Sequence, residues 1–276
     1  MNYQTGLAET RLNDRVSQDF SGFNQSHRQE NFSALMKFNG HGLADLKDAT
    51  LMDRVDTKYL VATNQLNDLL KKLLPHYTAL EINGSRMFTY HNTYFDTPKL
   101  DFYHQHHQGK LNRFKVRHRD YVDSEKGFLE VKFKNNKGRT IKSRIESSVA
   151  CVDGEDETEF LKSQLREAYP KLQASQWGSY QRIALANESA GERLTLDLNL
   201  SFSSMDSVRR VCLPDFFIAE LKQNKHDLQS PFAREMARLG IRPKKFSKYC
   251  IGTSLINPAL KSNRFKTVLM AAQKFH

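Results

Sequence analysis

Lysine and arginine residues alternate with apolar residues in three consecutive segments of the sequence. Successive side chains of a β-strand point to opposite faces, so residues two apart share a face. The charged faces of the three segments comprise Arg113, Lys115, Arg117 and Arg119, then Glu130, Lys132 and Lys134, then Thr140, Lys142, Arg144 and Glu146. The pattern predicts three neighbouring strands with one cationic and one apolar face.

Such a face needs something to offset its charge. Like charges directly opposite on paired strands destabilise a sheet, so the surface requires an acidic lining, abundant water or a bound anion. The simplest alternative is an ordinary antiparallel sheet whose basic face is solvated. The residues alone leave both interpretations open.

Two later segments place carboxylates on the equivalent face. Asp197 shares a face with Arg193 and Thr195, and Glu220 shares one with Lys222. By the same period, Asn199 should lie on this face and Leu200 on the opposite one. A mixed lining of cations and a few carboxylates suits polyphosphate with a divalent metal, and it disfavours nucleic acid as a partner.

Composition is consistent with a soluble globular protein. The chain has 276 residues, of which 39% are hydrophobic and 26% charged, with a formal net charge of +11. This excess of positive charge indicates an anionic partner. No long apolar run or signal peptide is evident, so we expect a cytoplasmic location. Three widely spaced cysteines predict buried thiols and no disulfide-linked partner.

The cationic segments belong to a series of about eight expected strands with helices between them. Asn64 begins a helix that ends near Pro75, and SPFAREMARLG from Ser230 has a serine cap, an early proline and a terminal glycine. FSKYCIGTSLI is expected to be the last packed element. We expect a polar, flexible N-terminal arm over residues 1–35, one domain over 36–256, and a basic, partly helical tail over 257–276.

This series of elements predicts an α+β fold. If the polar faces point one way, the sheet forms an antiparallel β-barrel, or tunnel, of about eight strands with a charged lumen and an exterior covered by α-helices.

Six ordered segments resemble a known family. DRVDTKYLV, KVRHR, LEVKFK with a later KSR, RLTLDLNL, IAELK and KKFSKY are similar to motifs of the VTC (vacuolar transporter chaperone) polyphosphate polymerase domain, within the triphosphate tunnel metalloenzyme superfamily. The similarity runs from about Phe38 to Ile256. It implies a tunnel whose basic residues grip phosphates and whose acidic residue binds Mn²⁺ or Mg²⁺.

The resemblance assigns roles to individual residues. Arg117, Arg119, Lys132 and Lys142 would hold the acceptor and transferring phosphates, and Glu220 would bind the metal. Further substrate contacts would come from Lys58, Lys134, Arg144, Lys222, Lys245, Ser247 and Lys248. The chain departs from the hydrolase and cyclase branch of the superfamily, because Arg54 and Asp56 precede Lys58 where that branch has two glutamates.

The expected activity is phosphoryl transfer from ATP to a growing polyphosphate chain, with a membrane protein as a further partner. Two alternatives stay open: tripolyphosphate hydrolysis in the same tunnel, and a non-catalytic module that binds polyphosphate, inositol phosphates or RNA.

Several of these residues also have simpler interpretations. Lys58 fits an exposed edge strand, Glu220 fits an ion pair with Lys222, and Lys245 and Lys248 fit a helix cap or solvent. The cluster His104, His106 and His107 resembles a metal-binding tract but fits a solvated loop better. Tyr94 and Tyr180 fit roles in packing.

Overall fold

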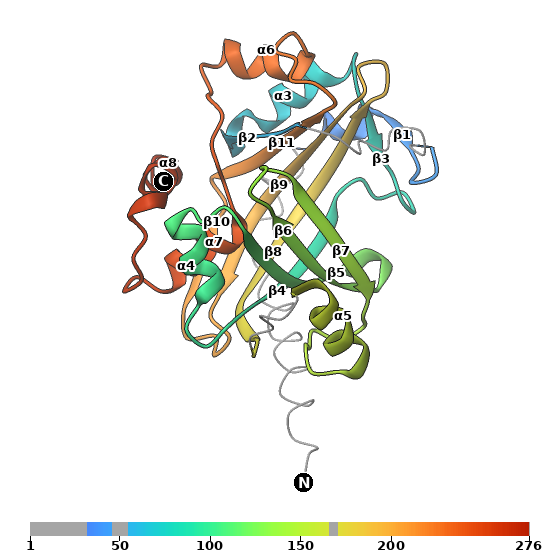
Figure 1. Cartoon of the computed structure of the whole chain (residues 1–276). Helices are drawn as coiled ribbons and strands as arrows, with labels where there is room; N and C mark the ends of the chain where they lie inside the picture. Colours follow the sequence, from blue (N-terminus) through green and yellow to red (C-terminus); the bar gives the residue numbers. More distant parts are fainter. Residues whose placement is uncertain (1–31, 46–54, 166–170, 276) are drawn as a thin grey trace.

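The computed structural model describes residues 32–45, 55–165 and 171–275, so most of the expected N-terminal arm lies outside the described residues. One large antiparallel sheet dominates, with helices on its outer face and at one end (Figure 1). Its eight main strands are β2 (Val55–Ala62), β4 (Phe88–Asp96), β5 (Arg113–Tyr121), β6 (Lys126–Lys134), β7 (Thr140–Glu146), β8 (Gln173–Asn187), β9 (Glu192–Ser203) and β11 (Phe216–Gln223).

The main strands pair in the order β2-β11-β9-β8-β4-β5-β6-β7, each antiparallel to its neighbour. Shorter strands extend it: β3 (Thr78–Leu80) pairs with β8 and with β1 (Asn39–His41), and β10 (Arg210–Leu213) pairs with β9. The predicted α+β, antiparallel fold is confirmed. Between the described residues of β2 and β7 there is no strand pairing, so the sheet curls without closing into a hydrogen-bonded barrel.

Register aligns the three cationic strands in cross-strand rows. Lys115 of β5 lies opposite Lys132 of β6, which lies opposite Lys142 of β7. In the next row Glu130 lies between Arg117 and Arg144. The predicted alternation therefore holds in all three strands, because none of them contains a bulge.

The predicted alternation fails in β9. Between Leu198 and Ser201 the pairing with β8 shifts, and Asn199 adopts a left-handed conformation with φ 51°. This bulge reverses the phase of the strand. Leu200 consequently packs in the inner apolar cluster, whereas Leu198 packs in the outer one. The prediction that Asn199 continues the charged face with Leu200 opposite it was wrong for this reason.

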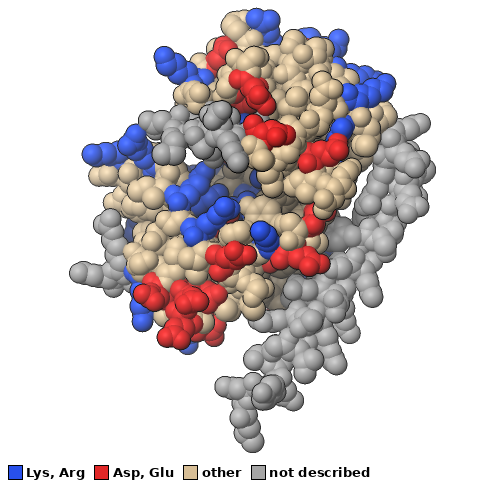
Figure 2. Space-filling model, turned by 90° about the vertical axis from the view of Figure 1, so that its right-hand side faces the viewer, with Lys and Arg blue, Asp and Glu red and all other residues tan. Residues whose placement is uncertain are grey.

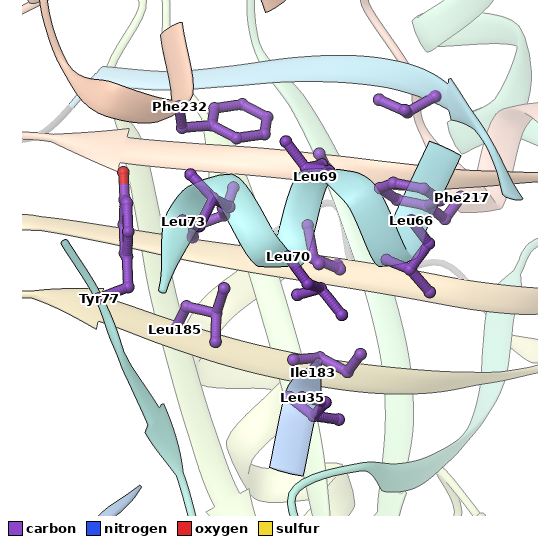
Figure 3. Packing of buried hydrophobic residues seen from close by; sticks show 14 of the residues in the cluster. Leu35, Leu66, Leu69, Leu70, Leu73, Tyr77, Ile183, Leu185, Phe217 and Phe232 are labelled. Atoms are coloured by element: carbon purple, nitrogen blue, oxygen red, sulfur yellow. The ribbon is translucent and has the colours of Figure 1, made fainter. Parts of the chain in front are cut away.

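Two helices cover the outer face of β2, β11, β9 and β8. Helix α3 (Leu66–Leu73) buries Leu66, Leu69, Leu70 and Leu73, a spacing that places all four on one side (Figure 3). Helix α6 (Pro231–Arg238) begins at the predicted cap, where the Ser230 hydroxyl accepts a hydrogen bond from the Ala233 N–H. Phe232 of α6 packs in the same apolar cluster. This outer core fixes the strands that carry charge on their other face.

Helix α7 (Lys248–Ile256), which lies in the segment expected to be the last packed element, packs on the inner face instead. Its Ile251 and Ile256 pack in the same apolar cluster as Leu60, Ile218 and Phe202. Gly252 permits this approach, because a Cβ there would lie 2.5 Å from side-chain atoms of Gln176 and Phe202. The helix thus fills one end of the curled sheet.

The remaining helices surround this end. Helix α4 (Asp101–Gln108) and helix α5 (Glu155–Leu165) pack with β4, β5 and β6 in a third apolar cluster. The expected tail contains α8 (Lys266–Gln273), whose Val268 and Ala272 are buried. Of the cysteines, Cys250 is buried but Cys212 is exposed, so the prediction that all three are buried was wrong.

Candidate functional site

A cavity of about 870 Å³ lies on the concave face of the sheet, and all eight main strands contribute to its lining. Eleven lysines and arginines and four carboxylates line it, a net of seven positive charges. Figure 2 shows Lys and Arg side chains gathered in and around a hollow in the molecule. The cavity is large enough for a nucleotide-sized ligand. Its charge selects for anions.

One wall comes from β5, β6 and β7 and is called here the lysine wall. It contributes six cations and one carboxylate to the lining: Lys115, Arg117, Arg119, Lys132, Lys142, Arg144 and Glu130. The Arg117 Nε donates to Glu130 Oε2 over 2.7 Å, and the Arg119 NH1 lies 4.0 Å from Glu130 Oε1. Burial would raise the pKa of Glu130, but the charges of Arg117 and Arg119 hold it well below its ordinary value.

The cross-strand row of Lys115, Lys132 and Lys142 contains no carboxylate. The charge of Arg117, burial, and the charge of Arg119 together hold the pKa of Lys132 well below that of a free lysine. Burial, and then the charges of Lys58 and Arg113, lower the pKa of Lys115. Lys115 Nζ also donates to the Ser247 hydroxyl over 2.8 Å. The wall therefore holds more positive charge than its own residues neutralise.

The opposite wall, from β2, β8, β9, β11 and the start of α7, is called here the paired wall. Asp197 accepts from Arg182 Nε over 2.6 Å and from Arg182 NH2 over 2.8 Å, and it also pairs with Lys248. Burial would raise the pKa of Asp197, but Arg182 and Lys248 hold it well below its ordinary value. This carboxylate joins two strands and the helix start.

Glu220 of β11, in the paired wall, also lies between two cations. It pairs with Lys58, and its Oε2 lies 3.2 Å from Lys222 Nζ. Burial would raise its pKa, but Lys222 and Lys58 hold it well below the ordinary value. Burial in turn lowers the pKa of Lys222 to about 8. Each of these carboxylates therefore lies between two cations.

The first residues of α7 add a helix start to the lining of the cavity. Ser247 caps the helix by accepting from the Cys250 N–H over 3.3 Å, and Lys248 lies at the first helical position. A helix start presents backbone N–H groups and a partial positive charge. Both residues line the cavity, so α7 directs this positive end toward its interior.

Tyrosines form part of the cavity floor. Tyr180 is 2% exposed and stacks on Tyr90 with ring centroids 5.3 Å apart, and Lys248 Nζ lies 4.2 Å from its ring centre. Among the described residues its hydroxyl has no hydrogen-bond partner. The prediction that Tyr94 and Tyr180 serve packing is thus incomplete, because both also line the cavity.

Ten of the twelve candidate site residues line this cavity. They are Lys58, Arg117, Arg119, Lys132, Lys142, Arg144, Glu220, Lys222, Ser247 and Lys248. Lys134 and Lys245 are exposed and lie outside the lining, and Arg54 lies outside the described residues. Lys58 and Lys248 are therefore not simply exposed to solvent, since both pair with carboxylates of the cavity.

Sequence reasoning assigned no role to several lining residues. Arg182 was missed, although its spacing of two from Tyr180 places both on one face. Asp197, Lys115 and Glu130 were placed on the charged faces, but nothing local indicated the pairs that they form. Such pairs depend on residues distant in the chain, as with Asp197 and Lys248.

The histidine cluster was misplaced by sequence. His104, His106 and His107 lie in helix α4, not in a solvated loop. His107 is 8% exposed, and its Nε2 lies 2.7 Å from Asn263 Oδ1, while His106 Nε2 lies 3.0 Å from the Phe114 carbonyl oxygen. Within the part of the chain that the structure describes, no three histidines, cysteines or carboxylates are grouped to hold a metal.

The cavity nevertheless fits a metal of one kind. Mg²⁺ and Mn²⁺ favour oxygen ligands, and such ions are commonly held by one or two carboxylates together with substrate phosphates. Glu220 offers one carboxylate inside the cavity, but Lys58 and Lys222 contact it. The donor set therefore fits an ion that arrives with phosphate oxygens, which would draw the two lysines away from Glu220.

Comparison with family models gives a match over most of the sequence. A family model described as the VTC domain matches residues 53–257. No curated protein shows significant similarity to the chain. None of the helices in the described ranges is long and apolar enough to cross a membrane.

Solved structures with a similar fold include two proteins described as candidate cyclases. The one from Vibrio parahaemolyticus, an adenylate cyclase candidate, has 13% identity and a TM-score of 0.42, and the match covers 72% of this chain and 97% of that one. The one from Hippeastrum, an adenylyl cyclase candidate with a dominant triphosphatase activity, has 13% identity and a TM-score of 0.44, covering 73% and 95%.

Proposed function

The chain belongs to the VTC domain family, and on that premise we propose that it transfers the γ-phosphoryl group of ATP to the end of a polyphosphate chain. One observation carries the proposal: eleven cations from separate strands and α7 converge on one cavity of about 870 Å³. A hydrophobic pocket or a flat basic surface would not bind several adjacent phosphate groups as well as this cavity does. The four carboxylates in the lining distinguish the cavity from a purely cationic anion trap.

The reaction needs no side-chain nucleophile. A terminal oxygen of the polyphosphate attacks the γ-phosphorus of ATP, a new P–O bond forms, the bond to the β-phosphate oxygen breaks, and ADP leaves. The chain's own residues must then position two polyanions and neutralise charge on the transferring group. Arg117, Arg119, Lys132 and Lys142 do this from the lysine wall, where their charge is least offset.

The paired wall and α7 hold the nucleotide. Lys58, Lys222 and Lys248 exchange their carboxylate partners for phosphate oxygens, and Ser247 presents the helix start. Arg144 and Lys245 contribute contacts at the edge of the site, and Lys134, which lies outside the lining, contacts only the polyphosphate chain. Glu220 would hold a Mn²⁺ or Mg²⁺, which when bound supplies further neutralisation of phosphate charge.

The test is incubation of the purified protein with ATP and either Mn²⁺ or Mg²⁺, followed by sizing of polyphosphate on a gel and assay of ADP and orthophosphate. We expect metal-dependent polymer together with ADP. Orthophosphate without polymer would indicate a hydrolase, and neither product would indicate a binding module.

A membrane partner is proposed only as a recipient of the product, and a cytoplasmic location would follow from the use of ATP.

Arg119→Ala provides the control that links activity to the cavity. Arg119 is 8% exposed, donates to Asn92 Oδ1 over 3.1 Å and lies over the Tyr90 ring. Its loss should lower turnover by roughly 10²–10³-fold, as expected when one preorganised donor is removed. The matched variant Lys126→Ala, an exposed position on β6, should retain activity. Normal turnover in Arg119→Ala with unchanged circular dichroism would reject the assignment.

A further inference from the structure

The cationic face of the lysine wall continues past the cavity. Beyond the row of Lys115, Lys132 and Lys142 comes a row in which Arg113 of β5 lies opposite Lys134 of β6. Lys134 in turn lies opposite Thr140 of β7, and Thr140 is a lining residue, whereas Arg113 and Lys134 are not. This row therefore marks the rim of the cavity.

The turn between β6 and β7 adds further positive charge beyond that row. Lys137 lies in it and is exposed, and its backbone N–H donates to Asn135 Oδ1 over 3.0 Å. Gly138 adopts a left-handed conformation with φ 78°, which completes the turn. Four residues of strand separate Arg117 from Arg113, about 13 Å. That length exceeds the span of a triphosphate.

Charge along this extension is not balanced locally. Arg113 and Lys134 are like charges directly opposite each other, as are Lys115 and Lys132 in the row before, and each such pair opposes folding. Neither row contains an aspartate or glutamate. The nearest carboxylate of the wall, Glu130, is held by Arg117.

Two further observations concern the surroundings of Arg113 and Lys134. Burial lowers the pKa of His106 to about 3, and the charges of Lys115, Arg113 and Lys134 add to that effect. Within the described chain, the buried Nε of Arg113 has no hydrogen-bond partner. The NH1 of the same guanidinium donates to the Lys110 carbonyl oxygen, which fixes Arg113 at the rim of the cavity.

We infer that Arg113, Lys134 and Lys137 form an external track that binds the part of a linear polyphosphate chain extending out of the cavity. This inference rests on the proposed function and specifies its substrate: a long chain engages cavity and track together, whereas tripolyphosphate engages the cavity alone. The ordinary explanation is that edge-strand lysines only discourage aggregation. That explanation predicts no dependence of affinity on chain length.

The experiment measures binding without ATP or metal, using tripolyphosphate and long-chain polyphosphate as probes in calorimetry. In Lys134→Ala/Lys137→Ala, affinity for the long chain should fall about 30-fold, because each lysine that is lost removes about 1 kcal/mol of electrostatic attraction. Affinity for tripolyphosphate should change less than twofold. The control is Lys72→Ala/Lys162→Ala, which removes the same charge from exposed positions on α3 and α5. It should leave both affinities unchanged.

Equal loss for both probes, or no greater loss than in the control, would overturn the track. The proposed function fails separately. If the wild-type protein makes no polymer but its preference for long chains disappears in the double variant, the track stands without the polymerase. If polymer is made and the double variant retains the preference, only the track is wrong. If the wild-type protein binds neither probe, both fail.

Discussion

The two walls of the cavity carry similar numbers of cations but differ in how that charge is balanced. The lysine wall contributes six cations and one carboxylate to the lining, and the paired wall contributes five cations and three carboxylates. Asp197 and Glu220 of the paired wall each lie between two cations. The lysine wall places Lys132 between Lys115 and Lys142 instead.

This difference distinguishes a wall that is held together before a ligand arrives from a wall whose charge is less offset. In the free protein Asp197 joins β9 to β8 and to the start of α7, and Glu220 joins β11 to β2. Lysines of the lysine wall repel one another until an anion binds. An enzyme benefits from such charge, because stabilisation that is absent in the free protein becomes available to the bound phosphates.

The largest effect on stability should come from the paired wall. Asp197 is 2% exposed, and Asp197→Ala would leave Arg182 and Lys248 without their shared counterion. Removing one partner of a buried pair costs about 3–5 kcal/mol. We expect a loss of that size in the free energy of unfolding, measured by urea denaturation.

Two variants make this test specific. Asp197→Asn retains the shape and one acceptor, so it should lose less stability than Asp197→Ala. Glu159→Ala removes a carboxylate from an exposed position of α5 and should change stability by no more than about 0.5 kcal/mol. If Asp197→Ala were no more destabilising than Glu159→Ala, the paired wall would not be a scaffold.

The lysine wall should respond in the opposite direction. Lys132→Met keeps the aliphatic stem and removes a charge that faces Lys115 and Lys142. Relief of that repulsion should stabilise the ligand-free protein by roughly 0.5–1 kcal/mol, while phosphate binding weakens. Thermal unfolding with and without tripolyphosphate measures both effects. Lys126→Met on the same strand should change neither, and a destabilised Lys132→Met protein would contradict the difference between the walls.

The lysine wall is also the part of the site that sequence predicted best. Its strands are consecutive, their connections are short, and none has a bulge, so the period of two places Lys115, Arg117, Lys132 and Lys142 correctly. The two helices that cover the outer face were also predictable from local sequence, because α3 carries its leucines at helical spacing and α6 has a serine cap. Local patterns suffice where structure is determined locally.

The paired wall was predicted less well, because its geometry depends on distant residues. Lys58 reaches Glu220 across 162 positions of sequence, and no local pattern indicates which cation a carboxylate will meet. The bulge at Asn199 changed the phase of β9 through pairing with β8. Helix α7 was expected only as the last packed element, because its apolar residues do not indicate which face of a sheet they cover.

The smallest effect we expect is a coupling between phosphate binding and protons in the lysine wall. Lys132 faces Arg117 and Arg119 from β5 and Lys142 from β7, and Glu130 on β6 only partly offsets these charges. The pKa of Lys132 is therefore held well below that of a free lysine. A bound polyanion would raise that pKa. Binding should therefore take up a fraction of a proton at a pH between the pKa of Lys132 in the ligand-free protein and its pKa in the complex.

The sign of this coupling follows from the direction of the shift. Because the anion raises the pKa of Lys132, affinity is fully present below the pKa of the ligand-free state and decreases as pH rises through the pKa of the complex. Calorimetry with tripolyphosphate in buffers of different ionisation enthalpy measures the uptake. Lys132→Arg keeps the charge and should lose the uptake, whereas Lys126→Met should keep it. Equal uptake in Lys132→Arg and wild type would show that the crowded lysine row is already fully protonated, and the two walls would then differ in charge but not in proton affinity.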